Sequence, residues 1–139
     1  GHSRKKCGYS FVLRIFRGIL TKNEKGVLEM SDIMKNIKKS EVLVLKDQID
    51  CSDGQVVSKT LAQNSAVSIT LFAFDKGEEI STHASGGDAL VTCLEGTGKI
   101  TIDGIEHILN QGDAIVMPAG HPHAVYGQEK FKMLLTVVF

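Results

Sequence analysis

The sequence predicts an all-β domain, folded as an antiparallel barrel or sandwich, and three observations support this fold class. Short segments of β-like pattern follow one another along residues 41–139, and Gly-rich turns separate them. The chain of 139 residues contains fourteen Gly and only two Pro, a composition that favours tight turns. Apolar residues at helical spacing are almost absent from the same region.

The length is typical of one domain. We predict a single barrel domain over residues 30–139, preceded by a leader over residues 1–29 whose native status is in doubt. Within this leader, residues 1–3 are typical of a cloning remnant. The apolar residues of 12–19 have helical spacing. Two interpretations of the leader stay open: a structural or surface-docking segment, and a stretch without an essential role.

One short helix is predicted ahead of the strands. Ser31 and Asp32 are residue types that cap helix N-termini, and the apolar residues Ile33, Met34 and Ile37 follow them at helical spacing. Together with the leader, this helix forms the N-terminal extension of the predicted barrel.

The strands are predicted from alternation and from turn residues. Residues 66–74 alternate between apolar and more polar side chains, so one face of this strand is apolar. Asp103-Gly104 separates two β-like segments and is a strong signal for a two-residue hairpin. The nine predicted strands cover residues 41–45, 55–62, 66–74, 89–94, 99–102, 106–109, 114–117, 123–126 and 130–138.

The formal net charge is zero, but the charges are unevenly placed. Residues 1–46 hold eleven Lys and Arg against four Asp and Glu, whereas residues 47–139 hold five against twelve. An acidic barrel half disfavours binding to a phosphate backbone. No segment reaches the roughly 20 apolar residues that a membrane helix needs. We therefore predict neither a nucleic-acid partner nor a membrane partner.

The three cysteines, Cys7, Cys51 and Cys93, are far apart in the sequence. Their spacing matches no zinc knuckle or redox pair. An odd number of cysteines also argues against a disulfide framework. We therefore predict a cytoplasmic location, where thiols stay reduced.

The strongest functional signal lies in two blocks of Gly and His residues. The second block has Gly112, Pro118, Gly120 and His123 at the spacing Gly-x5-Pro-x-Gly-x2-His. Pro118 stands at a predicted strand end, where the missing N–H does no harm.

The first block begins at Gly77, reaches His83 after five residues and ends at Gly96. With the hairpin between them, the two blocks resemble the two motifs of the cupin superfamily, in particular its small single-barrel bacterial members. The resemblance covers residues 41–139. It implies an antiparallel jelly-roll β-barrel, often dimeric, with a pocket at one mouth. In many members it also implies a divalent metal held by three His and one Glu.

The chain departs from this ligand set in the first block. Ser85 stands where the family has its second His, and Ala89 stands where it has Glu. Asp88 is adjacent to Ala89, but on a strand it would face the opposite side. His83 and His123 remain at family ligand positions. The metal that the resemblance implies would be Fe, Mn, Ni or Zn.

Four further residues are candidates for the site. His121 lies two residues before His123, so by strand parity it could supply a third nitrogen to the metal. Ser85, Asp88 and Tyr126 are candidate pocket residues. The predicted apolar lining of the pocket consists of Val67, Ile69, Leu90 and Val116.

Two functions stay open. In the first, the barrel binds a divalent metal through pocket histidines and acts on an unidentified small polar molecule. In the second, the barrel binds or senses a small ligand without metal and without catalysis, because the Glu and the second His are missing. Whether the protein is an enzyme therefore stays open. We also predict a homodimer, in which segments such as 41–45 pair across a two-fold axis.

Overall fold

The computed structural model describes residues 20–22, 28–30 and 33–139. The predicted helical stripe over 12–19 and the predicted cap at Ser31 and Asp32 lie outside these residues. The chain separates into two compact units, Gly1–Ile33 and Met34–Phe139. In the first unit, β1 (Leu20–Lys22) pairs antiparallel with β2 (Leu28–Met30). None of the helices among the described residues is long and apolar enough to cross a membrane.

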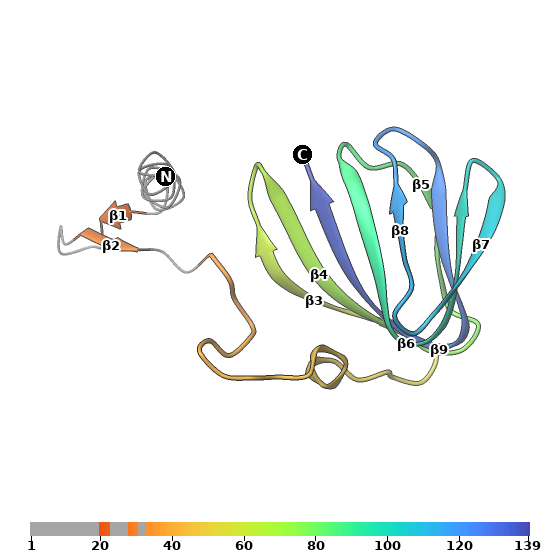
Figure 1. Ribbon diagram of the computed structural model, residues 1–139, viewed down its shortest axis with the longest axis horizontal. Helices are drawn as coiled ribbons and strands as arrows, with labels where there is room; N and C mark the ends of the chain where they lie inside the picture. Colours follow the sequence, from red (N-terminus) through yellow and green to blue (C-terminus); the bar gives the residue numbers. More distant parts are fainter. Residues whose placement is uncertain (1–19, 23–27, 31–32) are drawn as a thin grey trace, which may run out of the picture. The chain divides into compact units, whose positions relative to one another are not determined.

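The second unit is built from antiparallel strands, which confirms the predicted all-β fold class (Figure 1). Its main sheet has the strand order β3-β4-β9-β6-β7, while β5 pairs with β9 and β8 pairs with β6. These strands are β3 (Val56–Gln63), β4 (Val67–Phe74), β5 (Glu79–His83), β6 (Asp88–Ile102), β7 (Ile105–Asn110), β8 (Ala114–Met117) and β9 (His123–Val138).

Two long strands replace four short predicted ones. The predicted strands 89–94 and 99–102 are one strand, β6, which continues through register shifts at Cys93/Glu95 and Gly96/Gly98. The predicted strands 123–126 and 130–138 are likewise one strand, β9, paired with β6 along most of its length. Bulges of this kind bend a strand without ending it, so one long strand can line two regions of a barrel.

The structure corrects the prediction for the segment before the barrel. Residues 33–44 form neither the short helix nor the strand 41–45. Asn36 and Ser40 have left-handed backbone angles, with φ of 59° and 61°, which a helix does not accept. The backbone N–H of Lys35 donates to the carbonyl oxygen of Leu61 at 2.7 Å, a bond to the edge of β3 instead of one within a helix.

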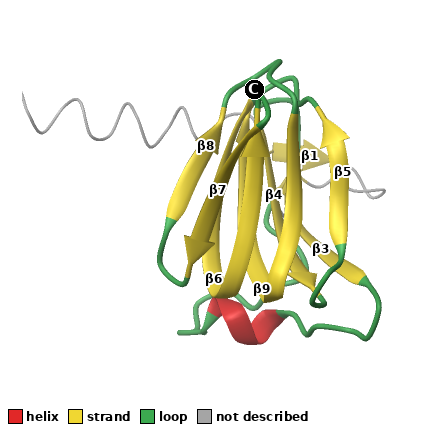
Figure 2. Ribbon diagram, turned by 90° about the vertical axis from the view of Figure 1, so that its right-hand side faces the viewer, coloured by secondary structure: helices red, strands yellow, loops and turns green. Residues whose placement is uncertain are grey.

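Residues Leu45–Gln48 form one turn of 3-10 helix, η1, which lies below the ends of β6 and β9 (Figure 2). Two lysine side chains of the sheet donate hydrogen bonds to backbone carbonyl groups of η1. Lys132 donates from Nζ to the carbonyl oxygen of Lys46 at 2.7 Å, and Lys59 donates to that of Gln48 at 3.0 Å. These bonds fasten the N-terminal segment to the sheet.

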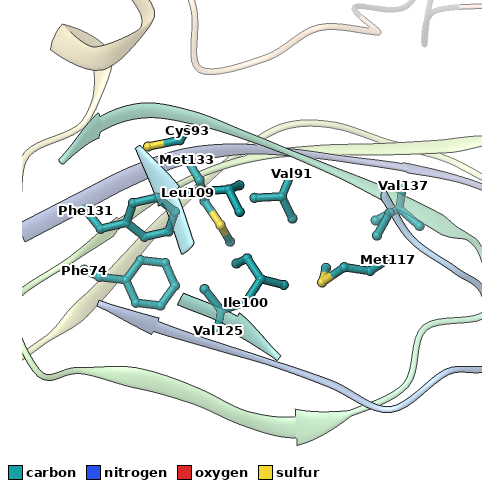
Figure 3. Packing of buried hydrophobic residues seen from close by; sticks show 11 residues of the cluster. Phe74, Val91, Cys93, Ile100, Leu109, Met117, Val125, Phe131, Met133 and Val137 are labelled. Atoms are coloured by element: carbon teal, nitrogen blue, oxygen red, sulfur yellow. The ribbon is translucent and has the colours of Figure 1, made fainter. Parts of the chain in front are cut away.

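The core has two parts because β4 buries side chains on both faces. Phe74 belongs to the cluster inside the barrel (Figure 3). Leu71 and Ala73 belong to a second cluster, against which Met34 and Ile37 of the N-terminal segment pack. Successive residues of a strand point to opposite faces, so the alternation of β4 serves both clusters.

The thiol of Cys93 is predicted to be unreactive in the folded protein. Its side chain is 1% exposed, and burial raises the pKa of its thiol to about 11. Because the thiolate is the reacting species, alkylation by iodoacetamide at pH 8 should be about 100-fold slower or more than after unfolding. Peptide mass spectrometry of protein labelled with and without guanidinium measures this ratio. Equal labelling of Cys93 in the two samples would contradict the buried position.

Candidate functional site

One region of the barrel interior is hollow. The cavity has a volume of about 170 Å³, and most of its lining is apolar. The polar residues in the lining are His83, Ser85 and His123. The apolar residues in the lining are Phe72, Ile80, Ala89, Met117, Val125, Met133, Leu135 and Val137. Pockets that bind small molecules typically combine an apolar wall with a few polar groups in this way.

Strand pairing brings His83 and His123 together in this cavity. His83 is the last residue of β5 and His123 is the first residue of β9, and the two residues are partners in the antiparallel ladder. Their Nε2 atoms are 3.2 Å apart. The ring centroids are 4.4 Å apart at an interplanar angle of 75°. The two imidazoles therefore converge through the same nitrogen.

Backbone carbonyl groups determine which nitrogen of each ring carries the proton. Nδ1 of His83 lies 2.8 Å from the carbonyl oxygen of Ser81, and Nδ1 of His123 lies 3.1 Å from that of His121. A carbonyl oxygen only accepts hydrogen bonds, so each Nδ1 donates. In the neutral form of each ring, Nε2 then presents a lone pair. Two lone pairs that face each other require a shared proton or a cation between them.

His123 is 2% exposed. Burial lowers the pKa of His123 below its ordinary value, and the charge of His83 lowers it further. The hydrogen bond to the His121 carbonyl opposes this shift. The shift favours the neutral imidazole, which is the form that binds a metal ion.

Ser85 and Asp88 lie differently with respect to the cavity. Ser85 lines it, and its Oγ both donates to the Gly87 carbonyl oxygen at 3.1 Å and accepts from the Gly87 N–H at 3.2 Å. Asp88 is exposed and turned away, because its Oδ1 accepts from the N–H of Ala119 at 2.9 Å. The methyl group of Ala89, 1% exposed, occupies the inward position beside it.

His121 and Tyr126 do not line the cavity. Nδ1 of His121 lies 2.6 Å from Oδ2 of Asp103, and about half of the His121 side chain is exposed. Tyr126 follows the buried Val125 on β9, and Nζ of Lys99 lies 4.9 Å from its ring centroid. In the part of the chain that the structure describes, no three His, Cys, Asp or Glu side chains are close enough to hold one metal ion.

The predicted apolar lining was wrong, because none of its four residues lines the cavity. Leu90 is 39% exposed and Val116 is 51% exposed, whereas their neighbours Ala89 and Met117 face the cavity. Ala89 and Met117 are partners in the β6–β8 ladder, and so are Leu90 and Val116. The spacing of the first motif already places residue 89 inward, and strand parity from that position would have identified the correct face.

The second unit is an antiparallel β-barrel, and two imidazoles converge in its largely apolar cavity. Residues 70–139 match the cupin domain family. The chain belongs to the cupin family, which confirms the resemblance and the barrel fold expected from the two motifs.

Three solved structures illustrate the relationship. A conserved protein of unknown function from Streptococcus pyogenes is 44% identical, with a TM-score of 0.76 over 79% of this chain and 96% of that one. A cupin superfamily protein from Desulfitobacterium hafniense is 36% identical, with a TM-score of 0.73 over 76% and 97% of the two chains. A cupin 2 conserved barrel domain protein from Leptotrichia buccalis is 41% identical, with a TM-score of 0.67 over 68% and 46%. No curated protein matches the chain.

Proposed function

We propose that this cupin binds a divalent metal ion through Nε2 of His83 and Nε2 of His123, and that it acts on a small molecule in the adjoining cavity. The observation that carries the proposal is the 3.2 Å separation of the two Nε2 atoms, with both Nδ1 atoms engaged elsewhere. Imidazole nitrogens bind such ions at about 2.0–2.1 Å, so two ligands at neighbouring coordination positions lie roughly 3 Å apart. The two side chains therefore fit one ion.

The chain's own groups orient this site. The carbonyl groups of Ser81 and His121 hold the two rings, as hydrogen-bond acceptors commonly do behind metal-binding histidines. A bound divalent ion would polarise a substrate oxygen as a Lewis acid. Nitrogen ligands of this kind suit Fe, Mn, Ni or Zn.

A second function is favoured by the small number of ligands. Two histidines without a neighbouring carboxylate also suit a metal-free barrel, in which the imidazole pair shares one proton. In that case the cavity binds or senses a small molecule without catalysis. Metal content distinguishes the two functions directly.

Metal content per chain is the test of the proposed function. We expect about one ion per chain in the wild type grown with Mn, Fe, Ni and Zn, and less than roughly a tenth of that in His83→Ala/His123→Ala, because both nitrogen ligands are removed. Inductively coupled plasma mass spectrometry of the purified proteins measures the metal content of the wild type and of the double variant. The control His121→Ala removes a histidine paired with Asp103 and should retain the metal. A wild type without metal, or a double variant with undiminished metal, would contradict the proposal.

A further inference from the structure

The connection between β8 and β9, residues 118–122, carries the group that orients His123. Nδ1 of His123 lies 3.1 Å from the carbonyl oxygen of His121, and a carbonyl oxygen only accepts, so Nδ1 donates. With the proton on Nδ1, the lone pair of the neutral ring lies on Nε2, the nitrogen that meets His83 in the cavity. The position of this connection therefore determines which nitrogen of His123 faces the cavity as an acceptor.

Burial does not hold the connection in place, because all five of its residues are exposed. Hydrogen bonds from the start of β6 and from the loop before it hold its first part. Oδ1 of Asp88, the first residue of β6, accepts from the N–H of Ala119 at 2.9 Å. The carbonyl oxygen of Ser85 accepts from the N–H of Gly120 at 2.9 Å. The side chain of Asp88 thus ties one end of β6 to the connection.

A second aspartate, Asp103, holds the other part of the connection from the opposite end of β6. Asp103 directly follows Ile102, the last residue of this strand. Its Oδ2 lies 2.6 Å from Nδ1 of His121, and its N–H donates to the carbonyl oxygen of Pro122 at 3.0 Å. The Asp103 side chain therefore fixes the residue whose carbonyl group orients His123.

We infer that Asp88 and Asp103 are positioning residues for His123: together they hold the connection 118–122, and the connection keeps the proton of His123 on Nδ1. Neither carboxylate lies in the lining of the cavity. Asp88 therefore serves the site from outside, without being a ligand or a pocket residue. The orientation of the ring needs no metal, whereas the consequence for metal affinity rests on the proposed function.

Three variants separate positioning from a merely structural role. Asp88→Ala/Asp103→Gly removes both carboxylates, and glycine accepts the φ of 51° at residue 103 without steric cost. Asp88→Asn/Asp103→Asn keeps an acceptor oxygen at both positions. Both aspartates are changed together because either one alone still ties the connection to β6. The matched control is Asp113→Ala, which removes a bond of the same kind, 2.9 Å from the Asn110 nitrogen to Oδ2 of Asp113, in the turn before β8.

The first readout is the tautomer of His123, observed in the long-range proton–nitrogen correlation spectrum of the histidine side chains. All proteins carry His83→Ala, so that no second imidazole competes for the proton, and they are measured at about pH 8, where an ordinary imidazole is neutral. We expect the form with the proton on Nδ1 to predominate in His83→Ala alone, in Asp88→Asn/Asp103→Asn and in Asp113→Ala.

In Asp88→Ala/Asp103→Gly the fraction of this form should fall at least about twofold, because the carbonyl acceptor is no longer fixed. An unchanged fraction in the folded variant would overturn the inference, and so would an equal fall in Asp88→Asn/Asp103→Asn. If the double variant does not fold, Asp88→Ala is measured instead, and an unchanged fraction there would likewise overturn the inference.

The second readout is the affinity for Co²⁺, measured by calorimetry with His83 present. Apparent affinity is proportional to the fraction of the protein in the form that binds, so Asp88→Ala/Asp103→Gly should lose at least about twofold in affinity. Asp88→Asn/Asp103→Asn also lacks both negative charges, yet it should bind Co²⁺ as tightly as the wild type does. Asp113→Ala should bind Co²⁺ equally well.

The two readouts separate this inference from the proposed function. A changed tautomer with an unchanged Co²⁺ affinity would support the positioning role and contradict the assignment of His123 as a ligand. A wild type that binds no Co²⁺ would contradict the proposed function, while the tautomer of His123 would still decide the inference.

Discussion

Gly96→Ala is expected to lower the free energy of unfolding by more than about 4 kcal/mol, a loss that few single substitutions reach. Gly96 lies in the irregular part of β6 with φ of 76°, a conformation that costs alanine roughly 1–2 kcal/mol. A Cβ atom there would overlap the carbonyl oxygen of Lys130 and lie 2.9 Å from its carbonyl carbon. The neighbouring Phe131 is fully buried, so β9 cannot easily move away. Urea unfolding followed by circular dichroism measures the change.

Gly112→Ala is the matched control for this prediction. Gly112 has φ of 90°, and a Cβ atom added to it would meet nothing within 4 Å. It should lose only the cost of the left-handed conformation, about 1–2 kcal/mol. If the two variants were destabilised equally, the contact with Lys130 would not be the cause.

Phe131→Ala is expected to cost about 3–5 kcal/mol of stability, as is typical when a buried aromatic side chain is removed. Phe131 is 0% exposed, and its ring centroid lies 5.5 Å from that of Phe74. A Cβ atom on Gly98 would lie 2.5–2.7 Å from the Phe131 ring, so this ring packs directly on the glycine backbone. Chemical denaturation measures the loss, and Phe139→Ala is the control. Phe139 is 59% exposed, and its removal should change stability by no more than about 0.5 kcal/mol.

The metal content of Phe131→Ala tests whether the packing of the core affects the candidate site. Phe131 does not line the cavity, whereas His83 and His123 do. Folded Phe131→Ala should therefore retain the metal content of the wild type, although it unfolds at a lower urea concentration. Loss of metal from the folded variant would show that the packing of Phe131 also supports the histidine pair.

Local patterns were sufficient to predict the fold class and the hairpin. The Asp103-Gly104 turn forms the predicted hairpin, with positive φ at both residues and Ile102 opposite Ile105. The spacing of the two motifs singled out His83 and His123 among five histidines, and the β5–β9 ladder brings these two together. The strand β5 itself was not predicted, because Glu79–His83 has little apolar alternation.

Predictions that depended on which face of a strand is buried were less successful. Leu90 and Val116 are as apolar as residues of the cavity wall, but they face outward. Alternation assigns the residues of a strand to two faces, but it does not determine which face packs against the core. In β4, both faces are buried. The segment before the barrel was also misjudged, because Lys35 bonds to the edge of β3, a contact that is distant in the sequence.

The amino-acid sequence by itself determined the all-β fold, the family and the hairpin, and it singled out His83 and His123 as candidates, since each of these depends on residue types at short, regular spacing. Only the tertiary structure decided that the two Nε2 atoms converge, that His121 is paired with Asp103, and that Asp88 lies outside the cavity. It also decided the size and apolar character of the cavity. The physical reason is that these properties depend on the register of strands that are far apart in the chain, and on side-chain hydrogen bonds that form only when those strands pair.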